Sequence, residues 1–160
     1  MAVRTIELHL PLAMAPVAAH ESLVRVMHAL ATAGAPTDRL TLAVQLSDLH
    51  VGVVGEVKIP TEMHIADRPV RWEFGLSIRA ASNEGIFPTF EGTLCLTPVG
   101  GKAVELWLQG SYEPPFGAIG DLLDRTVLHH AAERSLLSFM QRIVDDVVAD
   151  AKVHYDLRIL

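Results

Sequence analysis

The longest stretch of this sequence without a helix-breaking residue lies in the C-terminal region. From about residue 118 to residue 150 there is no proline, the only glycine is Gly120, and apolar residues recur with a helical period. A helix of about 33 residues would be about 50 Å long, so one apolar stripe along it must be covered by another part of the chain. The predicted stripe consists of Ile119, Leu122, Leu123, Leu137, Met140, Val144, Val147 and Val148.

Alternating apolar and polar residues predict that most of the remaining chain forms strands. Residues 3–10 place Ile6, Leu8 and Leu10 on one face, as a half-buried strand does. Further predicted strands are residues 40–46, 51–59, 61–66, 70–80, 88–97 and 102–112. Gly100 and Gly101 are typical of a hairpin turn, and they lie between the predicted strands 88–97 and 102–112.

A second, shorter helix is predicted near the N-terminus. Residues 16–33 have helical periodicity, and Gly34 and Pro36 mark its end. Two helices combined with a run of antiparallel strands predict an α+β fold, in which the sheet curves around the long C-terminal helix. No internal repeat or linker divides the chain, so we expect residues 1–160 to form one domain.

The overall charge limits which partners this chain can bind. Its 160 residues include 13 Lys and Arg against 19 Asp and Glu, a formal net charge of −6. An acidic chain without a basic cluster repels phosphate backbones, so nucleic-acid binding is disfavoured. Half of the residues are hydrophobic, which allows a neutral or lipophilic partner.

Cysteine content and hydropathy predict a cytoplasmic protein. The single cysteine, Cys95, cannot form an internal disulfide, which fits a reducing compartment. The longest run without Asp, Glu, Lys or Arg covers only residues 8–20, whereas a membrane-spanning helix needs roughly 20 apolar residues. Pro16 and Glu7 argue against a secretory signal in this run. We therefore expect no transmembrane segment.

Three polar residues interrupt the predicted apolar stripe of the long helix. Thr126, His130 and Glu133 share a face with Ile119 and Leu137. A dry core would select against them, whereas a solvated or ligand-filled cavity would accommodate them. In the alternative interpretation, His130 and Glu133 pair with each other or with Arg134 near a helix edge. The sequence leaves both interpretations open.

The sequence offers little support for a metal, a cofactor or a nucleophile. His129 and His130 with Glu133 resemble a helix-borne metal site, but about three ligands are usual and no second helix carries a matching pair. Cys95 lies in an alternating strand and is interpreted as a small buried residue. No nucleophile elbow and no glycine-rich phosphate loop occurs. We expect neither metal nor cofactor.

Three segments of the C-terminal half carry a resemblance to a known superfamily. They are FPTFEGTLCLTP at 87–98, ELWLQGSYEPPFGAIGDLLDR at 105–125 and HHAAERSLLSFM at 129–140. Together they resemble the START-like, polyketide-cyclase and pollen-allergen superfamily, most specifically at the junction from Tyr112 to Gly120. The resemblance covers residues 50–150 well. The first 50 match in outline, with one helix where that superfamily often has two short ones.

The resemblance implies a helix-grip fold with a cavity between the curved sheet and the C-terminal helix. Such cavities hold lipids, sterols, polyketides or other hydrophobic molecules in that superfamily. The junction residues Tyr112, Pro114, Pro115, Gly117 and Gly120 are interpreted as structural, because they end a strand and permit a tight entry into the helix.

We therefore predict a protein that binds a small hydrophobic molecule. The predicted ligand contacts are Trp72, Phe74 and Phe90 on the sheet and Thr126, His130 and Glu133 on the helix. One alternative is a cyclase or dehydratase-like enzyme with His130 as general acid or base and Glu133 as its orienting carboxylate.

A second alternative is a protein-interaction module with a filled core. Trp107 is expected on the outer sheet surface, because Val104, Leu106, Leu108 and Tyr112 share the opposite face. An outward tryptophan there would suit a homodimer interface.

Overall fold

The computed structural model describes residues 3–32, 37–45, 56–68, 72–80, 89–113 and 125–155. Its elements are β1 (Arg4–Leu12), α1 (Pro16–Thr32), β2 (Thr37–Gln45), β3 (Glu56–Arg68), β4 (Glu73–Ala80), β5 (Thr89–Pro98), β6 (Val104–Glu113) and α3 (Arg125–Tyr155). The six strands form one antiparallel sheet in the order β1-β6-β5-β4-β3-β2. This confirms the predicted α+β class.

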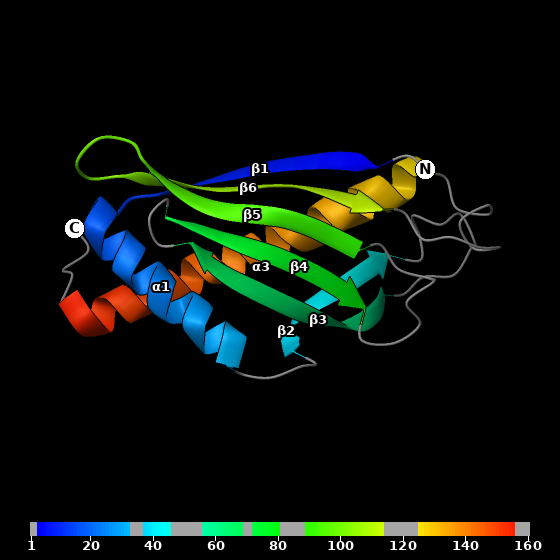
Figure 1. The fold of residues 1–160 in the computed structure, drawn as a ribbon, viewed down its shortest axis with the longest axis horizontal. Helices are drawn as coiled ribbons and strands as arrows, with labels where there is room; N and C mark the ends of the chain where they lie inside the picture. The colour runs from blue at the N-terminus through cyan, green and yellow to red at the C-terminus, as the bar shows by residue number, and fades with distance from the viewer. Residues whose placement is uncertain are drawn as a thin grey trace.

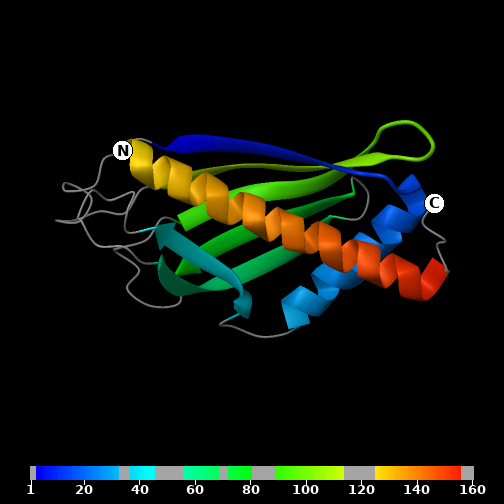
Figure 2. The same ribbon diagram turned by 180° about the vertical axis from the view of Figure 1, so that it is seen from behind.

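The long helix α3 crosses one face of the sheet, here called the inner face (Figure 2). Figure 1 shows the sheet from its other side, with α1 beside the C-terminal half of α3. The strands alternate as predicted, so that Ile6, Phe74, Leu94 and Leu108 are buried on the inner face. Gly100 adopts a positive φ of 77° in the turn between β5 and β6, which glycine tolerates without steric cost.

Two predicted strands, 51–59 and 61–66, are joined in the structure. Strand β3 is continuous from Glu56 to Arg68 and passes through Pro60. Pro60 pairs with Thr41 of β2 beside a register shift, and the pairing of β3 with β4 begins only at Thr61 and Ala80. The missing amide hydrogen of Pro60 therefore falls at an irregularity, where proline is tolerated. Residues 51–55 lie outside the described part.

Helix α3 confirms the long C-terminal helix but corrects the face that it buries. Leu137, predicted in the apolar stripe, has 41% of its surface exposed, whereas Met140 and Val144 are buried as predicted. The buried face is centred on Leu136, Phe139, Met140, Ile143 and Val147. Apolar residues occupy more than one side of this helix, and the sequence-based stripe was rotated away from the side that the fold covers. Residues 118–124 lie outside the described part.

Candidate ligand-binding site

A row of side chains crosses the inner face of the sheet near the first turns of α3. The strand register aligns Arg4 with Tyr112, Tyr112 with Phe90, and Phe90 with Ile78. Tyr112 is only 1% exposed, and Phe90 and Ile78 are also buried. This row therefore places buried aromatic and aliphatic side chains on the inner face of the sheet.

Two glycines make room for the ring of Phe90 in this row. Gly92 and Gly110 are paired across β5 and β6. A Cβ atom added to either glycine would come within 2.5 Å of Cζ of Phe90. The ring therefore lies over a depression in the sheet that only residues without a side chain provide.

Tyr112 links the sheet to α3 through a hydrogen-bonded chain. Its hydroxyl lies 2.9 Å from Nδ1 of His129, and Nε2 of His129 lies 3.1 Å from Oε1 of Glu133. A carboxylate only accepts hydrogen bonds, so Nε2 carries a hydrogen, and in the neutral imidazole Nδ1 accepts from the Tyr112 hydroxyl. Burial raises the pKa of Tyr112, while the nearby guanidinium of Arg4 opposes this shift. Tyr112 thus remains a hydrogen-bond donor at neutral pH.

His130 does not face the core, which corrects the prediction for the polar face of the helix. Its side chain is 60% exposed, and its Nδ1 lies 3.5 Å from Oε2 of Glu133. His130 and Leu137 are seven residues apart and therefore on the same helical face, which the sheet leaves uncovered. This is the helix-edge pairing that the sequence left open.

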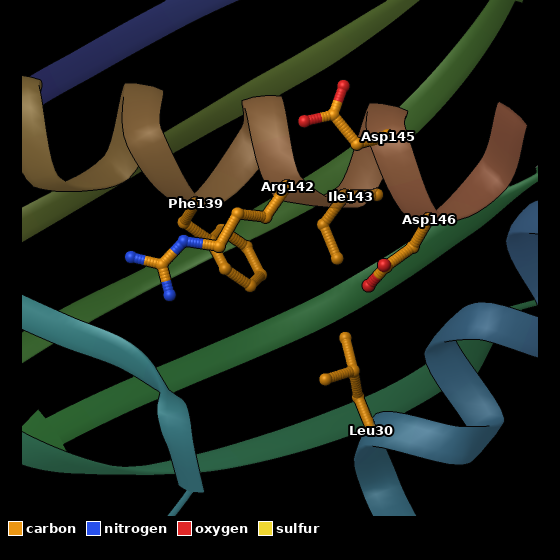
Figure 3. Close-up of a pocket in the computed structure, with 6 residues that line it drawn as sticks. All are labelled: Leu30, Phe139, Arg142, Ile143, Asp145 and Asp146. Atoms are coloured by element: carbon orange, nitrogen blue, oxygen red, sulfur yellow. The ribbon is translucent and has the colours of Figure 1, made fainter. Parts of the chain in front are cut away.

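A cavity of about 290 Å³ lies between α1 and the C-terminal half of α3. Leu30, Phe139 and Ile143 give it an apolar lining, and all three are buried. Arg142, Asp145 and Asp146 complete the lining with charged groups (Figure 3). The arrangement suits a mainly apolar molecule, because the three apolar residues are buried whereas the three charged residues all come from α3 and are exposed.

The six predicted ligand contacts do not gather at one place. Phe74 and Phe90 are buried on the inner face of the sheet, whereas Trp72 is half-buried at one end of β4. The carbonyl of Trp72 accepts a hydrogen bond from Leu96, six residues along β5 from Phe90, which corresponds to roughly 20 Å. His130 and Glu133 lie together on α3, and the side chain of Thr126 is outside the described part.

Trp72 has a different partner from the one expected. It adopts a positive φ of 54°, which is uncommon for a bulky residue, and its ring stacks on His20 of α1 with centroids 4.3 Å apart. Burial lowers the pKa of His20, and its Nε2 atom is buried without a hydrogen-bond partner among the described residues. Trp72 therefore helps to hold α1 against the sheet.

Sequence reasoning considered His129 with Glu133 only as part of a metal site, and it missed the cavity residues. His129 and Glu133 are separated by one helical turn, which also indicates a hydrogen-bonded pair. Phe139 and Ile143 have the same spacing and could have indicated a second apolar face. Nothing in the sequence shows that Leu30 of α1 lies opposite them.

Trp107 lies on the outer face of the sheet, as predicted. It stacks on His9, whose ring nitrogens contact Glu7 at 3.0 Å and Glu105 at 2.9 Å. The hydrogen bond with Glu7 raises the pKa of His9. A homodimer through this face stays a prediction.

Comparison with known proteins shows the fold of this chain. The chain is similar to a conserved protein from Geobacillus kaustophilus, with a TM-score of 0.60, 13% identity and coverage of 91% of this chain and 96% of that one. It is also similar to the Zhui aromatase/cyclase from Streptomyces sp. R1128, with a TM-score of 0.57, 13% identity and coverage of 99% and 100%. The chain therefore has the helix-grip fold, which confirms the START-like resemblance at the level of the fold.

A third similar structure contains bound molecules. It is the norcoclaurine synthase from Thalictrum flavum in complex with dopamine and hydroxybenzaldehyde, with a TM-score of 0.50, 10% identity and coverage of 93% and 88%. No family model matches the sequence, and no curated protein matches it either. Among the described residues, no helix is both long and apolar enough to cross a membrane.

Proposed function

We propose that the protein binds a small, mainly apolar molecule in the cavity between α1 and α3. The observation that carries this proposal is the cavity of about 290 Å³ with its buried lining of Leu30, Phe139 and Ile143. This volume is at the lower end of the range of about 300 to 1,000 Å³ found for ligand sites. A helix-grip protein crystallised with two small aromatic molecules adds support.

Most of the residues predicted from the sequence remain part of this proposal. Phe74 and Phe90 lie on the inner face that the helix covers, and a longer ligand would extend toward them. Contacts from Trp72, Thr126 and Glu133 to a ligand stay predictions, whereas the exposed His130 is not assigned to the proposed site.

The first experiment is native mass spectrometry of freshly purified protein. A co-purified apolar compound would appear as a mass additional to that of the chain, and its mass would indicate the ligand class. The second experiment is titration with N-phenylnaphthylamine, an uncharged apolar probe whose fluorescence rises in apolar sites.

A pair of substitutions on α1 locates the bound probe. Leu30→Phe adds an aromatic ring at the cavity wall and should weaken probe binding at least about fivefold, since it occupies part of the volume. Val17→Phe adds the same ring to the same helix at a position that is 63% exposed, and should leave affinity unchanged. If the wild type does not bind the probe or a co-purified compound, the alternative of an interaction module with a filled core is favoured.

A second function, acid–base catalysis, is favoured by the chain from Tyr112 through His129 to Glu133. In this arrangement His129, and not His130, combines a hydroxyl partner on one ring nitrogen with a carboxylate on the other. Nδ1 of His129 would accept the α-hydrogen of the substrate as a proton, while the Tyr112 hydroxyl turns to donate its proton to the carbonyl oxygen, which gives the enol. The imidazolium would then return its proton to the Tyr112 oxygen, with Glu133 orienting the ring. The substrate class would be an enolisable carbonyl compound.

Deuterium exchange tests this second function. Acetophenone in heavy water exchanges its methyl hydrogens only through the enol, so an active protein accelerates their disappearance from the proton NMR spectrum. His129→Gln should abolish the acceleration, and His130→Gln should retain it. Exchange no faster than in buffer would contradict catalysis of this kind. The hydrogen bonds from Tyr112 through His129 to Glu133 would then have a structural role only.

A further inference from the structure

Ser135 is a buried hydroxyl group that faces the core without a hydrogen-bond partner. Its residue is 5% exposed, and its Oγ atom has no partner within the described part of the chain. Ser22, the other buried polar residue found there, accepts a hydrogen bond from Arg25 at 3.3 Å. Buried polar groups are normally hydrogen-bonded, so the hydroxyl of Ser135 needs an explanation.

The position of Ser135 on α3 relates it to the cavity. Phe139, Arg142 and Asp146 follow it at four, seven and eleven residues, and all three line the cavity. At 100° per residue these positions lie within about 40° of Ser135, so they share one stripe of the helix. Ser135 is one turn, or about 6 Å, toward the N-terminus from Phe139. Ser135 does not itself line the cavity, but it continues the same stripe of α3 one turn beyond Phe139 and is buried there.

We propose that Ser135 is the polar anchor of the ligand site. In this arrangement an apolar ligand lies against Phe139 and Ile143, and one uncharged oxygen at its inner end hydrogen-bonds to the Ser135 hydroxyl. This inference rests on the proposed binding function and specifies the chemistry of the ligand. It also accounts for a polar atom that the unliganded protein leaves unsatisfied.

The surroundings of Ser135 favour an uncharged ligand oxygen over a charged one. Its nearest buried neighbours on α3 are Ala132, Leu136 and Phe139, which cannot compensate a charge. At the cavity, Asp145 and Asp146 outnumber the single cation Arg142, so the local charge does not favour a carboxylate. A hydroxyl can donate or accept, so a ketone, aldehyde, ester or alcohol fits, and the matched probes below separate acceptors from the oxygen-free analogue.

The experiment compares acetophenone with ethylbenzene, which differ by one carbonyl oxygen. Each compound displaces N-phenylnaphthylamine from the wild type, from Ser135→Ala and from Ser138→Ala. Ser138 is exposed on the same helix, so it is the matched control. We expect Ser135→Ala to weaken acetophenone binding about fivefold, the equivalent of one net hydrogen bond, and to leave ethylbenzene unchanged. Ser138→Ala should change neither affinity.

The thermal stability of the unliganded variant provides a second readout. Removal of an unpartnered buried hydroxyl should leave the Tm of Ser135→Ala equal or raise it, because alanine also favours the helix. A fall of about 3 °C or more would show that the hydroxyl already has a partner, such as the carbonyl one turn earlier, and would overturn the proposal.

The outcomes separate the two hypotheses. If Ser135→Ala weakened the binding of acetophenone and ethylbenzene equally, or of neither, the anchoring role would be overturned. The proposal of binding in the cavity would remain. Failure of the wild type to bind either compound or the fluorescent probe would overturn the proposed function itself, and with it the role of Ser135.

Discussion

The two halves of α3 meet the rest of the protein in different ways. The N-terminal half is joined to β6 through Tyr112 and His129, and the ring of Phe90 lies nearby over Gly92 and Gly110 of the sheet. The C-terminal half is joined to α1 through Arg25 and Asp150, whose charged atoms lie 2.8 Å apart. The cavity described above borders α3 from Phe139 to Asp146, from the middle of the helix into its second half.

The geometry of the two helices explains this difference. Figure 2 shows α1 and α3 crossing, and Arg25 and Asp150 mark a contact between them. Away from this contact the helices diverge, and the cavity lies in the angle between Leu30 and Ile143. A strand running beneath a helix can fill the intervening space along its length, whereas two crossing helices pack closely only near the crossing point. The cavity thus follows from the crossing of the helices.

The largest expected effect tests which face of α3 is buried. Met140→Asp places an unpaired charge at a fully buried position and should lower the free energy of unfolding by about 3 to 5 kcal/mol. Leu137→Asp, at a position that is 41% exposed, should cost about 0.5 kcal/mol or less. Urea denaturation measures both. Equal destabilisation by the two substitutions would contradict the orientation of the helix.

The two tyrosines allow a direct comparison of the two halves. Tyr112→Phe removes the hydroxyl that pairs with His129 and should cost about 1 to 2 kcal/mol. Tyr155→Phe keeps the ring over which Arg25 lies, 5.7 Å from its centroid, and should cost less than about 0.5 kcal/mol. Thermal unfolding at neutral pH provides the comparison. A greater loss in Tyr155→Phe would place the stronger polar contact at the α1 end.

The buried faces of the strands could be predicted from the sequence, whereas the buried face of α3 could not. Alternation along β6 was sufficient to place Leu106 and Leu108 inside and Trp107 outside, because a strand has only two faces. A helix has a continuous circumference, and α3 carries apolar residues on more than one side. Leu137 was therefore assigned to the core, and the sequence left open whether His130 faces it, although the fold covers the side with Phe139 instead.

The candidate site was predictable only in part for a related reason. Phe74 and Phe90 were correctly placed on the packed side of their strands, since each lies in an alternating run. The cavity depends on how α1 crosses α3, and no local pattern in Leu30 or Ile143 encodes that crossing. The choice between His129 and His130 required the position of Tyr112.

A smaller effect is expected when the pH is lowered, and it concerns the contact of α1 with the sheet. Burial lowers the pKa of His20 below its ordinary value of 6.5, so the folded state favours the neutral ring that stacks on Trp72. As the pH falls below about 6.5, the unfolded chain binds a proton that the folded chain does not, and stability decreases. Above that pH the contribution of His20 is constant.

The comparison with His20→Phe isolates this contribution. Phenylalanine keeps the stacking but does not titrate, so the difference in Tm between variant and wild type should grow as the pH falls from 6.5 toward the folded-state pKa. A pH-independent difference in Tm would contradict the role of His20.

Two other groups affect stability at different pH. The pKa of His9 is raised, so its stabilising contribution is present at low pH and is lost as the pH rises. The Arg25 guanidinium lowers the pKa of Asp150, so the stabilising contribution of Asp150 is lost only as the pH falls below 3.8.

The smallest expected effect concerns His130, on the half of α3 away from the cavity. His130→Phe should leave the affinity for N-phenylnaphthylamine unchanged, because the side chain is 60% exposed and the cavity begins at Phe139, more than two helical turns along α3. Ile143→Ala, at the cavity itself, should change the affinity of the same probe severalfold, since it removes part of the apolar wall and enlarges the cavity. Circular dichroism establishes that both variants are folded before titration. If His130→Phe altered binding as strongly as Ile143→Ala, a ligand would have to contact α3 before Ser135, and the assignment of binding to the stretch from Ser135 to Asp146 would be wrong.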